Sequence, residues 1–198
     1  SRDPHETKNL ARDPAHRKQL LAMREALYDN LAATFDVALL PEGMFHDAAK
    51  EHGITPADLT RKKGFYSVPE IRKAADLLLQ PDLKAGQVAQ MLKAKLPSQR
   101  YWAALTCLYL GEHLTQTLSH ELAQLLNDSS RSVQIAAAEA LATYPLDEKQ
   151  RSAAIESLLG NSDPTASSAY HAVAALNALD HQPQSILKPL KERILKLP

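Results

Sequence analysis

The fold is decided by three similar stretches, LPSQRYWAALTCL (residues 96–108), DSSRSVQIAAAEAL (128–141) and DPTASSAYHAVAAL (163–176). When they are aligned, one position holds alanine in all three, a second holds small residues and a third holds leucine. The aligned triplets are Ala104, Ala137 and Ala172; Cys107, Ala140 and Ala175; and Leu108, Leu141 and Leu176. The pattern therefore recurs after 33 and then after 35 residues.

Stacked helical hairpins explain this register. Their inner helices approach one another closely, so small residues belong at the crossings and a leucine one position later fills the groove between layers. The period is shorter than the 40 to 47 residues of HEAT repeats and close to the 34 of tetratricopeptide repeats. The tetratricopeptide signature Trp-x2-Leu-Gly-x2-Tyr is absent, because Ala-Ala-Leu-Thr follows Trp102. We therefore expect a right-handed HEAT-like solenoid of about three to four hairpins.

The rest of the chain also favours an all-α fold. Apolar residues recur at three- and four-residue spacing, and prolines stand at helix starts. From residue 68 onward we expect eight helices, over 69–79, 84–94, 98–110, 113–127, 130–144, 147–159, 165–179 and 184–197. Asp128 and Asp163 lie in loops before two of these helices, where their oxygens are expected to cap backbone N–H groups.

A long helix is predicted near the start of the chain, over residues 14–35. Asp13 suits the N-cap and Pro14 the first helical position. Its apolar residues share one face, which is expected to be buried: Leu20, Met23, Leu27, Leu31 and Phe35. The chain thus divides into three parts, residues 1–35, a connector over 36–67 and the repeat region over 68–198.

The connector is expected to be irregular. We predict an extended piece over residues 37–40, then a short helix opened by Pro41, and turns at Gly53 and Gly64. It contains its own small set of apolar residues, Leu39, Leu40, Met44, Phe45 and Leu59.

Composition narrows the range of functions. The chain has 198 residues, 44% of them hydrophobic, and a formal net charge of zero. It is long enough to bury a core, and its neutral charge gives no reason to expect nucleic-acid binding. A single cysteine, Cys107, excludes an internal disulfide framework. No apolar run is long enough to predict a membrane span or a signal peptide.

No self-sufficient active site is predicted. Cys107 occupies a position held by alanine in the other repeats, so it is interpreted as a small core residue and not as a nucleophile. The eight histidines lack the spacing of a helical zinc site, and no phosphate-binding loop or nucleophile elbow occurs.

One aromatic and cationic cluster, Arg100, Tyr101 and Trp102, is a candidate interaction surface for a ligand or a peptide. The alternative, which we favour, is a packing role: Trp102 fills space between layers while Arg100 and Tyr101 extend from its edges. Basic residues on the last predicted helix, 184–197, indicate a capping helix for the solenoid in preference to a membrane anchor.

The first residues add a family resemblance. The phrase Asp-Pro-x-Glu-x-x-Asn-Leu is formed by Asp3, Pro4, Glu6, Asn9 and Leu10. It resembles the C-terminal closing segment of the sulfatase family, which leads into a final helix. The connector and RYWAAL (100–105) are similar to the extension that some bacterial sulfatases carry, in which HEAT-like repeats follow.

The resemblance implies a calcium-dependent hydrolase of sulfate esters or sulfamates that uses a formylglycine made within a Cys/Ser-x-Pro/Ala-x-Arg motif. That motif is absent, because Cys107 is followed by Leu-Tyr-Leu-Gly. Calcium and formylglycine are therefore expected in a catalytic domain upstream of this chain, and no catalytic, cofactor or metal residue is assigned here. What transfers is structural: a turn at Pro4, a local backbone bond from Asn9, and an anchoring role for Leu10.

Two functions follow as expectations. The first is a non-catalytic C-terminal part of a periplasmic or extracellular sulfatase, inactive alone, which packs on the catalytic domain or binds a protein or a sulfated glycan. The alternative is a free-standing HEAT-like scaffold for protein–protein interaction.

Overall fold

The computed structural model describes residues 3, 5, 7–11, 13–62, 65–165 and 168–196, and helices connected by short loops make up this part of the chain. The helices are η1 (Pro14–His16), α1 (Arg17–Thr34), α2 (Glu42–Glu51), α3 (Pro56–Arg61), α4 (Val68–Ala75), η2 (Asp76–Leu79), α5 (Ala85–Leu92), α6 (Pro97–Leu110), α7 (Glu112–Thr117), α8 (Ser119–Leu125), α9 (Arg131–Thr143), α10 (Glu148–Asn161), α11 (Ala169–Asp180) and α12 (Gln184–Ile194). No strand occurs among the described residues, so the predicted all-α class is confirmed.

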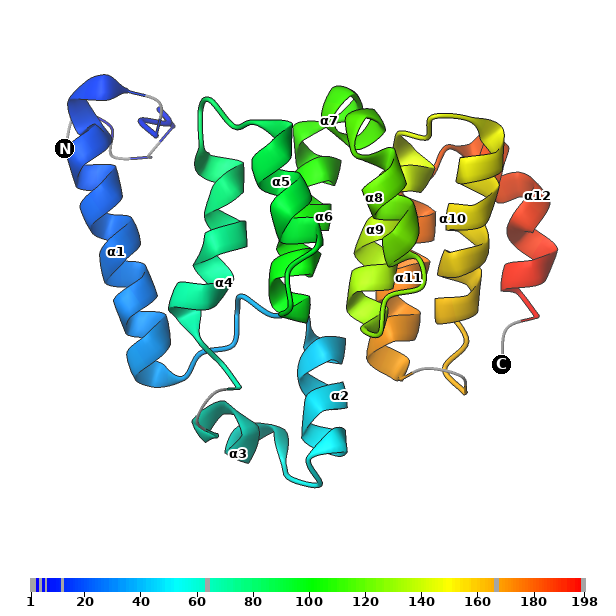
Figure 1. The fold of residues 1–198 in the computed structure, drawn as a ribbon, viewed down its shortest axis with the longest axis horizontal. Helices are drawn as coiled ribbons and strands as arrows, with labels where there is room; N and C mark the ends of the chain where they lie inside the picture. Colours follow the sequence, from blue (N-terminus) through cyan, green and yellow to red (C-terminus); the bar gives the residue numbers. More distant parts are fainter. Residues whose placement is uncertain are drawn as a thin grey trace.

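The helices from α4 onward form an array of neighbours. Along one row α4 contacts α6, α6 contacts α9, and α9 contacts α11. The helices α5, α8 and α10 pack on this row, each against the helix next to it in the chain. In Figure 1, α1 and α12 lie at opposite ends of the molecule, and α2 and α3 lie below the array.

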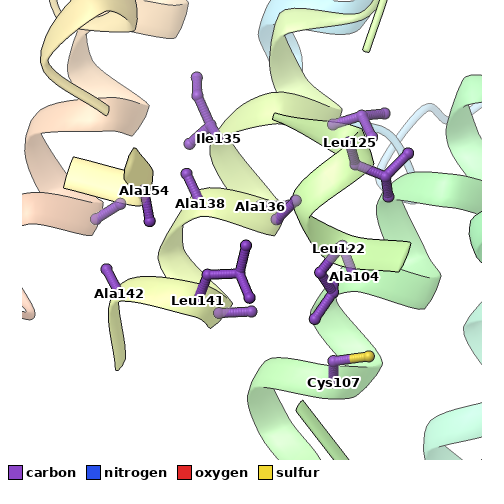
Figure 2. Packing of buried hydrophobic residues seen from close by; sticks show 14 of the residues in the cluster. Ala104, Cys107, Leu122, Leu125, Ile135, Ala136, Ala138, Leu141, Ala142 and Ala154 are labelled. Atoms are coloured by element: carbon purple, nitrogen blue, oxygen red, sulfur yellow. The ribbon is translucent and has the colours of Figure 1, made fainter. Parts of the chain in front are cut away.

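The core is centred on α9, which buries nine residues, five of them alanine. Figure 2 shows side chains from α6, α8 and α10 meeting those of α9. Alanines permit close approach of the helix backbones, while Leu122, Leu141 and Leu158 fill the spaces between them and are fully buried. The core is therefore continuous across the hairpins.

The small residues that align in the three similar stretches are buried in all three. Ala104 and Ala137 are 0% exposed and Ala172 is 5% exposed, and the triplet that contains Cys107 is fully buried. The leucine position varies more: Leu141 is fully buried, whereas Leu176 on the last row helix is exposed. Leu176 borders a depression that residues of α12 also line, and it stays partly open to solvent there.

Several local predictions were wrong. One helix over 113–127 is two, because the backbone leaves helical geometry at Leu118 (φ −106°, ψ 18°). The break lets α7 cross the end of α6 while α8 packs along α9. Residues 37–40 form a turn closed by a bond from Leu40 N to Val37 O (2.8 Å), not an extended piece.

Two loop aspartates also differ from expectation. Asp128 and Asp163 accept bonds from loop N–H groups, of Ser130 and Thr165 respectively (2.8 Å each), and do not cap the helices that follow. The connector contains a second short helix, α3, whose Leu59 is fully buried. The predicted turn at Gly64 lies outside the described residues.

Candidate functional site

Arg100, the first of the three candidate interaction residues, is engaged inside the fold. Its guanidinium binds both carboxylate oxygens of Asp128 (2.6 and 2.8 Å), and it also donates to the carbonyls of Ala94 and Lys95. The two charged side chains are 12% and 6% exposed. Arg100 therefore ties the α5–α6 loop to the loop before α9.

The rings of Tyr101 and Trp102 meet edge to face, 6.1 Å between centroids, but their polar atoms lie in different surroundings. The indole N–H of Trp102 donates to the carbonyl of Leu39 in the connector (2.8 Å). Tyr101 lines a groove beside α9, and burial raises the pKa of its phenol to about 12. Consecutive helical residues point about 100° apart. The polar groups of the three side chains therefore face three different surroundings, although the rings of Tyr101 and Trp102 are in contact.

The groove that Tyr101 lines is the candidate site, and we call it the α9 groove. It has a volume of about 470 Å³. Its lining residues come from α2 and the segment before it, α6, α9 and α11: Pro41, Glu42, Gly43, Tyr101, Leu105, Ser132, Ile135, Ala136, Glu139, Ala169, Tyr170, His171, Val173, Ala174 and Asn177.

Helical periodicity explains why these residues converge. On α9 the lining positions are i, i+3, i+4 and i+7 from Ser132, and on α6 they are i and i+4 from Tyr101. On α11, Tyr170 is followed by lining residues four and seven positions later. Three neighbouring helices therefore each turn one face toward the same space, and the start of α2 closes one end.

His171 and Ser132 are buried polar residues of this groove, and His171 is 1% exposed. Its Nδ1 lies 2.8 Å from Ser168 Oγ, and its Nε2 lies 3.2 Å from Ser132 Oγ and 3.6 Å from Asp47 Oδ2. Burial lowers the pKa of His171, opposed by the charge of Asp47 and reinforced by that of Arg131. The imidazole therefore joins α2, α9 and α11 as a largely neutral group.

The contacts of His171 hold the start of α11 against α2 and α9. Ser168 is the N-cap of α11, and its hydroxyl faces Nδ1 and accepts from His171 N (3.4 Å). Ser132 and Asp47 face the other nitrogen, Nε2. Because the ring is buried among these partners, we interpret its contacts as structural.

Gly43 allows α2 to approach the imidazole. A Cβ atom at this position would lie 2.5 Å from His171 Nε2, a distance that real Cβ contacts do not reach. A residue without a side chain is therefore required where α2 meets α11.

The ionisable groups of the groove are mainly acidic. Glu139 is 17% exposed, and Glu42 at the mouth is 67% exposed. Each has a histidine beside it outside the lining: His181 Nδ1 is 2.8 Å from Glu139, and His46 Nε2 is 3.9 Å from Glu42. No lysine or arginine is among the described lining residues.

The described residues offer no metal or thiol chemistry. Within the described ranges no group of three or more potential metal ligands is present. Cys107 is fully buried, and burial raises the pKa of its thiol to about 12, as expected for a core residue.

Among the helices that the structure describes, none is long and apolar enough to cross a membrane.

A second feature is the outer face of α1. Within Arg17–Thr34, all of it described, Leu31 is the one buried residue. Met23 is 63% exposed and Leu27 is 54% exposed, so the apolar face predicted to be buried is largely open. Near the start of α1, a depression of about 230 Å³ is lined by Leu10, Leu20 and Met23, among others.

Polar contacts attach α1 to α4. Arg72 binds both carboxylate oxygens of Glu25 (2.6 and 2.9 Å) and lies over the ring of Tyr28, 3.9 Å from its centroid. The Tyr28 hydroxyl donates to Asp76 (2.5 Å). These contacts orient α1 while its apolar face remains uncovered.

Comparison with known proteins adds no relative: no protein family, curated protein or solved structure matches this chain. Function is therefore argued from the residues themselves. The α9 groove was missed by the sequence reasoning, which assigned α9 and α11 to the core. The spacing of Tyr170, Val173, Ala174 and Asn177 on the helix face opposite Ala175 and Leu179 was the available signal.

Proposed function

We propose that this chain is the non-catalytic C-terminal part of a sulfatase, and that the apolar face of α1 packs on the catalytic domain. In this proposal the array is HEAT-like, the parent protein is periplasmic or extracellular, and calcium and formylglycine belong to the catalytic domain. The chain alone hydrolyses no sulfate ester or sulfamate.

The exposed face of α1 is the observation that carries the proposal. Exposing large apolar side chains in a row costs free energy, about 25 cal/mol for each Å² left in water. Scattered apolar residues on a surface need no explanation, but Met23 and Leu27 lie one turn apart on α1, and Met23 shares a depression with Leu10 and Leu20. A helix of this pattern is suited to packing against another body.

The closing phrase supports the same proposal through its local geometry. The carboxylate of Asp3 accepts bonds from the backbone N–H groups of Thr7 (3.1 Å) and Lys8 (2.8 Å). The side chain of Asn9 accepts from Ala11 N (2.9 Å), the local bond expected of it. Pro4 and Glu6, the other polar or turn positions of the phrase, lie outside the described residues. The phrase thus organises its own backbone.

The test uses the parent protein at its natural length with the double substitution Met23→Ser and Leu27→Ser. We expect sulfatase activity on an aryl sulfate with calcium to fall and the thermal midpoint of the catalytic domain to drop. The control is Leu146→Ser, which alters a 62% exposed leucine on the α9–α10 loop. The control should leave both quantities unchanged.

Two outcomes would contradict the proposal. If the reading frame around this chain encodes no formylglycine motif upstream of Ser1, the chain is not part of a sulfatase. If the motif is present but the double variant matches the control, α1 does not pack on the catalytic domain.

A further inference from the structure

We propose that the α9 groove binds an extended peptide segment of another protein, which places a lysine or arginine side chain at Glu139 and an apolar side chain on Ile135 and Val173. The inference does not depend on the sulfatase proposal, because it concerns a different face of the molecule and different residues.

The size and lining of the groove suit a short piece of peptide. Its volume of about 470 Å³ lies within the range of known ligand sites, about 300 to 1,000 Å³. The floor is apolar and buried, with Ile135 5% and Ala136 2% exposed. An apolar side chain placed there removes its own surface from water, together with surface of the exposed Val173 at the rim.

The charge of the groove selects a cation. Glu139 and Glu42 are the acidic side chains of the lining. The lining also contains His171, whose pKa is lowered by burial, so that this ring favours its neutral form. Glu139 is 17% exposed, so a cation that reaches it is partly shielded from water. Opposite charges attract each other more strongly away from water than in it. Tyr101 and Tyr170 add aromatic rings, whose faces attract cations, and one face of Tyr170 is already stacked on the ring of His46 (4.1 Å between centroids).

The histidines beside the two glutamates leave room for this cation. His181 and His46 each approach their glutamate through one ring nitrogen, whereas an arginine guanidinium can bind both oxygens of a carboxylate. His181 itself is 67% exposed, and its ring can move into water when a stronger cation approaches Glu139. Neither histidine lines the groove.

The same charges disfavour a sulfated ligand at this site. A sulfate group would lie near carboxylates, with no lysine or arginine among the described lining residues to neutralise it. Sulfated glycans are therefore expected to bind elsewhere on this chain or not at all.

The open mouth favours a chain over a small enclosed amine. Tyr170 is 40% exposed and Val173 is 57% exposed, so the apolar lining continues from the groove onto the surface of α11. A peptide covers both parts, whereas a small amine occupies the polar end alone.

The experiment is a titration followed by NMR of the methyl groups of Ile135, Val173 and Leu105. The probe is the capped peptide Ac-Ala-Leu-Arg-Val-Ala-NH2, and its matched control replaces arginine with neutral citrulline. We expect the arginine peptide to shift these methyls and to bind about tenfold more tightly than the control, the contribution of a charge-assisted bond. Agmatine and a sulfated disaccharide complete the set, and both are expected to bind weakly or not at all.

Two variants of the protein assign the binding to the groove. Glu139→Gln keeps the shape and should weaken the arginine peptide about fivefold or more. Val173→Lys, at an exposed position, places a cation at the mouth and should abolish binding without unfolding the protein. The control Glu192→Gln removes an exposed carboxylate on α12, away from the groove, and should change nothing.

Several results would overturn the inference. The arginine and citrulline peptides could bind equally well, or the peptide could cause no methyl shifts up to about 5 mM. The arginine peptide could also bind Glu139→Gln as tightly as the native protein. Tighter binding of agmatine than of the peptide would make this a site for small amines. Methyl shifts caused by the sulfated disaccharide would refute the charge argument.

Discussion

Gly43 lies against the imidazole of His171 because no side chain fits between α2 and α11 at that point. The contact sets how closely the connector approaches the array, and the bonds of His171 to Ser132 and Ser168 fix the ring that Gly43 meets. One residue without a Cβ and one buried ring thus determine the depth of this junction.

The Gly43→Ala substitution tests the junction. The added Cβ would overlap His171, so either the ring or α2 must shift, and we expect a loss of about 1–3 kcal/mol in the free energy of unfolding. Urea unfolding measures it. Gly86→Ala is the control, since a Cβ at Gly86 on α5 meets nothing within 4 Å and should stabilise by up to about 1 kcal/mol. Equal effects of the two substitutions would mean that Gly43 is not tightly packed.

The pair formed by Arg100 and Asp128 gives a second prediction at this scale. Asp128→Asn leaves a buried guanidinium without its counterion, and we expect the free energy of unfolding to fall by about 3 kcal/mol. Urea unfolding again measures the change. Glu156→Gln breaks the exposed pair with Arg193 and should hardly shift the urea midpoint. If Glu156→Gln shifted the urea midpoint as much as Asp128→Asn, burial would not determine how much an ion pair contributes to the free energy of unfolding.

Some roles of single residues could be predicted from the sequence, and others could not. The burial of Cys107 followed from its place among alanines in the repeat. The pairing of Arg100 with Asp128 did not, because the partners are 28 positions apart and their contact depends on how two loops meet. The role of His171 was equally hidden, since its partners come from three different helices.

At the scale of elements, the docking of α2 depends on a titratable group. His171 faces Asp47 of α2 and Arg131 of α9, together with hydroxyls of Ser132 and Ser168. Because burial lowers its pKa in the folded chain, the unfolded chain binds a proton more readily. His171 therefore makes its whole contribution to the free energy of unfolding at pH values above its ordinary pKa of 6.5, and this contribution is lost as the pH falls below that value.

Urea unfolding from about pH 8 to about pH 5 tests this dependence. We expect the free energy of unfolding to fall over this range in the native protein and to fall less in His171→Gln. An unchanged slope in His171→Gln would assign the pH dependence to other groups.

Helix boundaries were predicted best where the apolar pattern was long. The helices around α6, α9 and α10 lie within a few residues of expectation, because their buried faces are continuous. The break at Leu118 was missed, since Leu114, Leu118 and Leu122 keep helical spacing while the backbone turns to pack α7 and α8 on different neighbours. The apolar spacing of α1 predicted a helix correctly but not the exposure of its face.

At the scale of the whole molecule, stability is expected to be uneven along the array. Helix α9 lies in the middle with nine buried residues, whereas Leu31 alone is buried in α1. Elements with few buried contacts open locally without global unfolding.

Hydrogen exchange measures this difference. We expect amides of α1 to exchange at least about 100-fold faster than those of α9, whose exchange should require global unfolding. The isolated chain at low concentration is the sample, so that no other molecule covers α1. Equal protection of the two helices would contradict the open face described for α1.

The bond between Trp102 and Leu39 gives the chain an optical reporter. Trp102 is the single tryptophan, and its indole spans the boundary between the connector and the array. Its emission should shift to longer wavelength when the connector separates and water reaches the ring. Detachment of residues 36–67 can therefore be followed by fluorescence in the unlabelled protein, separately from the helical signal of the array.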